Sequence, residues 1–213
     1  MGFTGIHGAA FLGMVEIAAA QLDMKEWDAN APDYSGNTVL TWAARRGQEE
    51  VVHMVLERGN VNPDQVDTEY GLTPLSWGAR NGHSGVVKML LERGNVNPDH
   101  ADTFHGKTPL SWAAVSGHSE VVKMLLERGD VKPDKADTKY GRTPLSWAAG
   151  YGDSKVVKML LERGDVNPDQ ADTEYGRTPL WRAAEYGHSG VVNVEIFCIF
   201  PSIFHDTTVY FFT

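Results

Sequence analysis

The sequence predicts an all-α solenoid of helix-turn-helix repeats with extended, turn-rich fingers. The first observation is a period of 35 residues, which a recurring glycine marks at Gly36, Gly71, Gly106, Gly141 and Gly176. The second is the similarity of the copies, because 27 of the 35 positions are identical between segments 106–140 and 141–175. The third is the run TPLSWAA, which begins at Thr108 and again, unchanged, at Thr143. A period of this size indicates stacked units that contact only their neighbours and present an elongated surface.

Each repeat carries the signals for two short helices, as segment 71–105 illustrates. Thr73 is expected to cap a first helix at Pro74–Asn81, since proline is favoured at the first helical position. Gly82 ends this helix, because glycine tolerates the left-handed conformation found there. A second helix is predicted at about Ser84–Arg93, where apolar residues recur at helical spacing. The N-P-D sequence that follows predicts turns, so the rest of the unit is expected to form the finger.

Stacking is expected to supply the stability that a single repeat lacks, because isolated helices shorter than ~12–15 residues are marginal in water. A tryptophan holds the same position in four copies, as Trp42, Trp77, Trp112 and Trp147. Each indole can bury ~150–250 Å². We therefore expect this row to be the main cohesive element, and to belong to the core rather than to a stacking platform for a ligand.

These motifs together resemble the ankyrin repeat family. Thr-Pro-Leu, Ala-Ala, Gly-His and Val-Val-Lys recur in register over about residues 2–194. The resemblance implies a module that binds a protein partner in a concave groove lined by the first helices and fingers. Ser76, Ser111 and Ser146 stand where the family has histidine, so its Thr–His hydrogen bond is expected to be absent or altered. The unit is also two residues longer than the usual 33.

The combination of T-P-L-S-W-A-A, L-L-E-R and N-P-D is similar to ankyrin arrays of filamentous fungi. Such arrays often form the sensor half of larger proteins with a nucleotide-binding NACHT module, although no P-loop is present in this sequence. The alternatives to a simple binding module are a sensor fragment of a larger NLR-like protein and an accessory protein or enzyme on an ankyrin scaffold in a fungal pathway. A purely structural spacer is disfavoured by the diversity at the groove positions.

The array is predicted to be one domain over residues 1–194, followed by a Phe-rich tail at 195–213. Its copies lie at about 2–35, 36–70, 71–105, 106–140, 141–175 and, in part, 176–194. In the last copy Trp181 and Arg182 stand where serine and tryptophan stand elsewhere, which puts a charge at a core position. Three explanations of the tail stay open. They are an aberrant reading frame or unspliced intron, a hydrophobic cap on the last repeat, and a membrane or partner contact.

Positions that differ between copies are the candidate partner-binding residues. They lie at the end of the first helix and directly after the marker glycine, where an ankyrin-like stack has its groove. The candidates are Arg45, Arg46, Arg80, Asn81, Val115, Ser116, Tyr151, Glu185, Tyr186, Lys107, Arg142 and Arg177. Core positions hardly vary, so we interpret this diversity as recognition rather than drift. Tyr151 and Tyr186 are the expected anchors, since tyrosine is enriched at interface hot spots.

Charge and composition argue against several other functions. The net charge is −9, with 28 acidic and 19 basic residues, and a negative field repels phosphate backbones, so no nucleic-acid partner is expected. The one cysteine, Cys198, lies outside the repeats, which fits a reducing compartment. The sequence has no apolar run of about 18 residues, the length that predicts a transmembrane helix, so no membrane partner is expected. The cytoplasm or nucleus is the expected location.

No catalytic or metal site is predicted. His83, His118 and His188 share one repeat position, but packed helices lie ~8–10 Å apart, too far for one zinc ion with bonds of ~2.0–2.1 Å. We interpret them as hydrogen-bonding residues at helix starts. The finger carboxylates lack the spacing of a calcium loop and are assigned to turns. No phosphate loop, nucleophile elbow or H-E-x-x-H motif is present, so neither an enzyme nor a cofactor is expected.

Overall fold

The computed structural model describes residues 4–24 and 28–199, and in these ranges it contains twelve helices and no strand. The helices are α1 (Gly5–Leu12), α2 (Val15–Leu22), α3 (Val39–Arg46), α4 (Glu49–Glu57), α5 (Pro74–Asn81), α6 (Ser84–Leu91), α7 (Pro109–Val115), α8 (Ser119–Glu127), α9 (Pro144–Tyr151), α10 (Ser154–Leu161), α11 (Pro179–Glu185) and α12 (Ser189–Ile199). The predicted all-α class is confirmed. The bounds predicted for α5 are also confirmed, whereas α6 ends at Leu91 rather than at Arg93.

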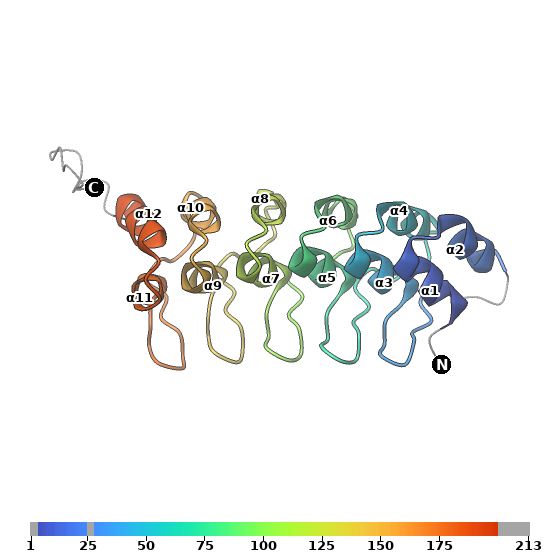
Figure 1. Cartoon of the computed structure of the whole chain (residues 1–213), viewed down its shortest axis with the longest axis horizontal. Coiled ribbons are helices and arrows are strands. Elements are labelled where there is room, and N and C mark those ends of the chain that lie inside the picture. The colour runs from blue at the N-terminus through green and yellow to red at the C-terminus, as the bar shows by residue number, and fades with distance from the viewer. Residues whose placement is uncertain (1–3, 25–27, 200–213) are drawn as a thin grey trace.

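The helices form two layers in a single row of pairs (Figure 1). Odd-numbered helices lie side by side in one layer, even-numbered helices form the second, and the fingers project from the odd-numbered layer (Figure 1). Helix α5, for example, packs against α3 and α7 in its own layer and against α6 in the other. This arrangement is the predicted solenoid. We call the surface made by the odd-numbered helices and the fingers the first-helix face.

Threonine begins the first helix of each later repeat, as predicted. At α5 the Thr73 hydroxyl accepts a hydrogen bond from the Ser76 amide, and Pro74 occupies the first turn. The family's histidine occurs in the first repeat alone among the described copies, where His7 Nδ1 lies 2.8 Å from Thr4 Oγ1. In the third repeat Ser76 Oγ lies 3.0 Å from Thr73 Oγ1 instead. The threonine contact is therefore altered in the later copies rather than lost.

The main core between the two layers is aliphatic. Its rows of Leu, Val and Ala run through all six helix pairs of the described residues and are fully buried at positions such as Leu110. Trp77 and Trp112 are buried as predicted, but with Leu72 they form a second, smaller cluster beside this core. The expectation that the indole row is the main cohesive element is therefore wrong. An indole N–H needs an acceptor when buried, and the acceptor lies in the finger, outside the aliphatic layer.

Hydrogen bonds cross the junctions between repeats at several recurring positions. Three of them, between the third and fourth repeats, join His118 Nε2 to Arg80 O (3.1 Å), Arg128 Nη1 to Leu91 O (2.7 Å) and Lys132 N to the Asp99 carboxylate (3.1 Å). The arginine of L-L-E-R and the aspartate of N-P-D thus act between repeats. These side chains satisfy carbonyl and amide groups at helix and turn ends that have no partner within their own repeat.

The histidines form hydrogen bonds at helix starts as predicted, and their partners lie in the preceding repeat. His83, His118 and His188 stand at the starts of α6, α8 and α12, but each ring contacts a carbonyl at the end of the preceding repeat's first helix. The imidazole projects along the stack, towards a helix end whose last carbonyls lack partners. Asp153, which replaces histidine in the fifth repeat, does cap its own helix and accepts a hydrogen bond from the Val156 amide at 2.9 Å.

Gly82→Ala should test the contact between a helix end and the next repeat's histidine. Gly82 has φ +75°, and a Cβ there would lie 2.6 Å from His118 Nδ1. Gly187 has φ +73° but open space around it, so Gly187→Ala carries the backbone strain alone, about 1–2 kcal/mol. We expect Gly82→Ala to lower the free energy of unfolding by more than Gly187→Ala in urea titrations. Equal losses would mean that the histidine moves aside freely.

The last repeat departs from its sister copies in two core positions. Arg182 is buried, as the sequence indicates, and forms an ion pair with the buried Asp172. Helix α12 continues to Ile199, and Glu195 stands where Leu160 stands one repeat earlier. Glu195 is 0% exposed, and neither of its carboxylate oxygens has a hydrogen-bond partner. Residues 200–213, on which the explanations of the tail depend, lie outside the described residues.

Candidate protein-binding face

An aspartate near the end of each finger holds the tryptophan of the following repeat. At the junction of the third and fourth repeats, Asp102 Oδ1 accepts hydrogen bonds from the amides of Phe104, His105 and Gly106, while Oδ2 accepts from the Lys107 amide and from Trp112 Nε1 at 3.0 Å. Trp42, Trp77 and Trp147 bond in the same way to Asp33, Asp67 and Asp137. The assignment of these carboxylates to turns was correct but incomplete, because one oxygen also holds the indole by its edge.

Arg182 takes over the role of the indole in the last repeat. Its guanidinium donates to Asp172 Oδ2 from Nε and Nη2, at the position where the other repeats have a tryptophan N–H. Burial of the Asp172 carboxyl raises its pKa, but hydrogen bonds from the Tyr175 amide and from Arg182 more than offset this effect, so the pKa lies below its ordinary value. The buried arginine is therefore compensated by a carboxylate that stays charged.

Cations cover the faces of the indoles. Arg45 lies over Trp42 and Trp77, Arg80 over Trp77 and Trp112, and Lys107 over Trp112 and Trp147, at 4.0–5.3 Å from the ring centroids. Arg142 lies 4.8 Å from the Trp147 centroid and Arg177 4.0 Å from that of Trp181. Cation–π contacts of this length are worth ~0.5–2 kcal/mol each. Cations and indoles thus alternate along the first-helix face and join adjacent repeats.

One cation of this row comes from each repeat after the first, but from one of two positions. Arg45 and Arg80 end the first helices of the second and third repeats, where the residue after the marker glycine is uncharged. In the next three repeats Lys107, Arg142 and Arg177 follow the marker glycine, and the helix-end position carries no cation. The two variable positions therefore compensate for each other, because both reach the same rings.

Lys107 is the most enclosed of these cations, at 5% exposure. Burial lowers the pKa of its ammonium group, while the nearby Asp137 and Asp102 carboxylates act in the opposite direction. The ammonium group lies between two indole faces, which limits its contact with a partner.

The remaining candidate residues fall into two groups. Asn81 donates a hydrogen bond to Arg45 O, and Glu185 pairs with Arg177 at 2.8 Å, so both already have partners within the chain. Tyr151 and Tyr186 extend into solvent, at 61% and 56% exposure, with Ser116 also exposed and Val115 half-buried. Arg46 lies over the Phe11 ring. These contacts distinguish the candidate side chains that already interact within the chain from those whose surface is open to a partner. Binding by any of them stays a prediction.

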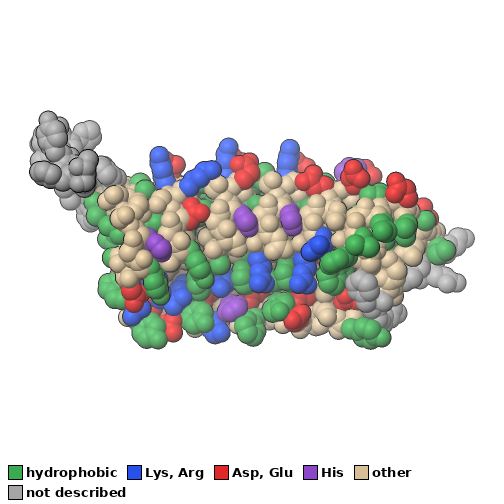
Figure 2. All heavy atoms as spheres, in the orientation of Figure 1, with side chains coloured by type: hydrophobic (Ala, Val, Ile, Leu, Met, Phe, Trp, Pro, Cys, Tyr) green, Lys and Arg blue, Asp and Glu red, His purple; other side chains and the backbone are tan. Residues whose placement is uncertain are grey.

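Exposed aromatic side chains gather on the same face. Within the described residues, the exposed Tyr, Trp and Phe residues all lie on first helices or fingers: Tyr34, Phe104, Tyr151, Tyr175, Trp181 and Tyr186. Figure 2 shows hydrophobic and cationic side chains mixed along the band formed by these elements. Aromatic and arginine side chains are the types enriched in protein interfaces.

A cavity of about 220 Å³ opens on this face between α9 and α11. It is lined by Arg142, Ser146, Trp147, Gly150, Tyr151, Arg182 and Tyr186. Arg142, Tyr151 and Tyr186 were predicted site residues, and the structure brings these three together. Ser146, Trp147 and Arg182 were missed, because each appears in the sequence as a helix-start or core residue. The exceptional sequence of the last copy was the signal that could have pointed to this junction.

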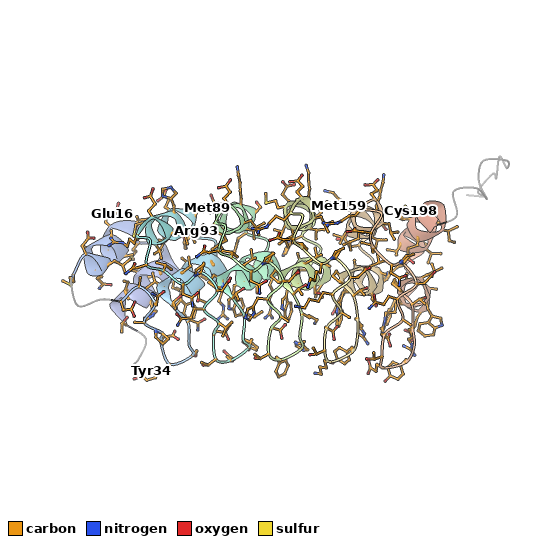
Figure 3. The ribbon with its side chains drawn as sticks, turned by 180° about the vertical axis from the view of Figure 1, so that it is seen from behind. Glu16, Tyr34, Met89, Arg93, Met159 and Cys198 are labelled. Carbon is orange, nitrogen blue, oxygen red and sulfur yellow. The ribbon has the colours of Figure 1, made fainter. Side chains whose placement is uncertain are left out.

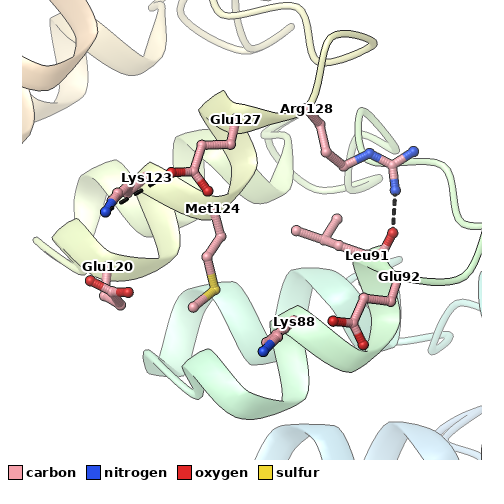
Figure 4. A pocket seen from close by; sticks show the side chains of 8 residues that line it. All are labelled: Lys88, Leu91, Glu92, Glu120, Lys123, Met124, Glu127 and Arg128. Atoms are coloured by element: carbon pink, nitrogen blue, oxygen red, sulfur yellow. Dashed lines mark hydrogen bonds and ion pairs between the residues drawn. The ribbon is translucent and has the colours of Figure 1, made fainter.

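The second-helix side presents cavities of a different kind. In Figure 3, which views the molecule from behind, the second helices form the upper row, with Met89 on α6 and Met159 on α10. A cavity of about 380 Å³ lies between α6 and α8, where Met124 extends towards α6 and Arg128 bonds to Leu91 O (Figure 4). A similar cavity of about 280 Å³ lies between α8 and α10. Because it recurs at successive junctions, it follows from helix spacing and offers no distinct site.

Neither a metal-binding cluster nor a membrane-spanning helix occurs among the described residues. Over 4–24 and 28–199, no cluster of three or more His, Cys, Asp or Glu side chains could hold a metal ion. In the same ranges, every helix is too short or too polar to span a lipid bilayer.

The fold and this face define a helix-turn-helix solenoid that exposes aromatic side chains along one side. A family model described as ankyrin repeats (3 copies) matches residues 6–102, 60–137 and 130–194. The chain belongs to the ankyrin repeat family, whose domains generally mediate protein–protein interaction and are typically not catalytic. No curated protein matches the sequence.

Three solved structures share the fold. An ankyrin repeat domain from Acinetobacter baumannii AYE is 27% identical, with a TM-score of 0.78 over 91% of this chain and 96% of that one. EF0377, an ankyrin repeat protein, is 23% identical, with a TM-score of 0.80 over 89% and 95%. The ankyrin repeat domain of Bcl-3, a member of the IκB family, is 22% identical, with a TM-score of 0.81 over 92% and 86%.

Proposed function

We propose that this chain is a non-catalytic module that binds a protein partner along its first-helix face. The observation that carries the proposal is the gathering of exposed aromatic side chains on that face alone among the described residues. Tyr151 and Tyr186 lie at adjacent junctions and flank one cavity, so they are the anchors. The cations of the indole row hold the face in one shape before binding, which reduces the entropy lost on association.

The motif resemblance supports a narrower proposal about origin and location. The repeated T-P-L-S-W-A-A sequence is of the type found in filamentous fungi, and we place the protein in the cytoplasm or nucleus of such an organism. There it acts either on its own or as the sensor part of a larger NLR-like assembly.

Capture experiments with two matched double variants test the binding face. Tyr151→Ser with Tyr186→Ser removes the anchors, and serine is already present at the equivalent Ser116. We expect the capture of proteins from an extract of the source organism by the immobilised full chain to be reduced by at least about thirtyfold, because a hot-spot residue contributes ~2 kcal/mol or more. Arg80 is unsuitable as a test residue, since it covers two indoles.

The control is Lys88→Ala with Lys123→Ala, two exposed residues on α6 and α8 of the opposite side. This variant should capture the same proteins as the wild type. Capture that survives loss of both tyrosines but is lost in the lysine variant would place the binding surface on the second helices and contradict the proposal.

A further inference from the structure

The cavity between α9 and α11 exists because one side chain is missing. Gly150 stands where sister repeats have Arg45, Arg80 and Val115, and a Cβ at Gly150 would meet no atom within 4 Å. The fifth repeat thus lacks the side chain that occupies this position at the earlier junctions. The floor of the cavity includes Ser146 and Arg182, which are both at least 97% buried.

Two hydrogen-bond donors in this cavity have no partner. Ser146 Oγ is buried and unbonded, whereas the equivalent Ser76 and Ser111 hydroxyls contact their threonines at 3.0 and 3.2 Å. Arg142 Nε is likewise buried and unbonded, although its Nη2 donates to Glu174 at 2.8 Å. An unsatisfied buried donor costs ~1–3 kcal/mol. Ser146 and Arg142 both line this cavity, so we consider an acceptor that enters it and bonds to both groups.

The walls of the cavity select the kind of acceptor. The charged residues that line it are Arg142 and Arg182, which pair with Glu174 and Asp172, and no carboxylate is among its lining residues. The Trp147 and Tyr151 rings stack at 6.2 Å and form an apolar wall, and the Tyr186 ring closes the rim. A carboxylate on a short chain of methylene groups matches the hydrogen-bond donors on the floor of the cavity and the aromatic rings of its wall. In a protein partner that group is an acidic side chain.

We propose that this cavity binds the carboxylate of a glutamate side chain from the protein partner. The carboxylate accepts hydrogen bonds from Arg142 Nε and the Ser146 hydroxyl, while the glutamate methylenes pack against Trp147 and Tyr151. This inference rests on the proposed function, since it names the chemistry of the partner at one point of the first-helix face.

Titration of the full chain with two capped amino acids tests the proposal. The probes are N-acetyl-glutamate amide and N-acetyl-glutamine amide, which differ in the charged oxygen alone. The signals are the Nε–H resonance of Arg142 and the indole N–H resonance of Trp147 in ¹⁵N-labelled protein. We expect the glutamate probe to shift both and to bind about tenfold more tightly than the glutamine probe, which is the difference expected for one hydrogen bond to a charged group.

Three variants test whether binding of the glutamate probe depends on the cavity and on the Ser146 hydroxyl. Ser146→Ala should weaken the glutamate probe about tenfold, whereas Ser111→Ala, whose hydroxyl already has Thr108 as partner, should leave it unchanged. Gly150→Val introduces the residue found at Val115 and should abolish the shifts while the helical signal and melting temperature are kept. Equal shifts with both probes, or binding that survives Gly150→Val, would overturn the proposal.

The two proposals fail in distinguishable ways. If the glutamate probe does not shift Arg142 but partner capture still depends on Tyr151 and Tyr186, the face binds a partner of other chemistry and this inference alone is wrong. If the probe binds but the tyrosine variants capture partners normally, the cavity is an anion site and the proposed binding face is wrong.

Discussion

Asp102→Ala is expected to lower the free energy of unfolding by about 4 kcal/mol. The carboxylate accepts hydrogen bonds from four backbone amides and from Trp112 Nε1, at 2.6–3.3 Å. Its removal leaves several buried donors without an acceptor, each at a cost of ~1–3 kcal/mol. Partial access of water to the finger limits the total. Urea unfolding followed by tryptophan fluorescence measures the loss.

Two companion variants separate the indole contact from the turn. Trp112→Phe keeps an aromatic ring but removes the N–H donor, so it should lose about 1–2 kcal/mol. Asp102→Asn keeps one acceptor oxygen and should fall between wild type and Asp102→Ala. A loss for Asp102→Ala of less than ~0.5 kcal/mol, the range of ordinary surface changes, would show that the finger reorganises around the gap.

The helices and their ends could be predicted from the sequence because their signals are local. Thr73, Pro74 and Gly82 each act within one turn of their own helix, and the repeat supplies several copies of the same evidence. A signal that is both local and repeated depends little on tertiary context. Contacts between repeats were harder to predict, and the ring of His118 reaches a carbonyl of the preceding unit rather than its own helix.

The row of cations could be predicted only in part. Lys107 and Val115 were each recognised as variable, but their diversity was interpreted position by position. A cation at either position lies over the indole of its own repeat and over that of the next, as Arg80 and Lys107 do, so a cation at one makes a cation at the other unnecessary. This compensation is present in the sequence as one cation per repeat, yet its meaning depends on knowing that the two positions converge. Part of the diversity attributed to recognition therefore maintains an internal contact.

The cavity could not be predicted because it arises where a side chain is missing. Gly150 appears in the sequence as one more variable residue at a helix end. Its effect depends on what neighbouring repeats place around it, namely Arg142 from the same unit and Arg182 from the next. Burial of Ser146 without a hydrogen-bond partner likewise requires the three-dimensional packing. Local sequence specifies the helices, whereas the site depends on how non-identical repeats meet.

Glu195→Leu is expected to stabilise the last repeat and to remove a pH dependence of its stability. Burial, and to a lesser degree the charge of Asp169, raise the pKa of Glu195 from an ordinary value of 4.5 to about 7. The folded state therefore binds this proton more tightly than the unfolded state. Stability is fully present below the unfolded pKa and decreases as the pH rises towards the folded pKa. The difference of about 2.5 pKa units corresponds to roughly 3 kcal/mol lost above neutral pH.

Leucine is the matched replacement, since Leu160 fills the same position in the preceding repeat. Because a terminal repeat of a solenoid can open on its own, hydrogen exchange of the α12 amides is the sensitive measurement. Glu195→Leu should slow this exchange by roughly two orders of magnitude at about pH 8, which is the ratio that 3 kcal/mol gives. Near pH 4.5 the gain should be much smaller.

Glu195→Gln separates the charge from the packing. The amide has nearly the same shape as the carboxyl group but does not titrate, so the pH dependence should disappear while the burial of an unpaired polar group remains. Asp64, Asp99 and Asp134, whose pKa values are also raised by burial, are common to all three proteins and cancel in the comparison. If α12 of the Glu195→Gln variant still loosens between about pH 5 and pH 8 as much as the wild type does, the buried glutamate is not the titrating group.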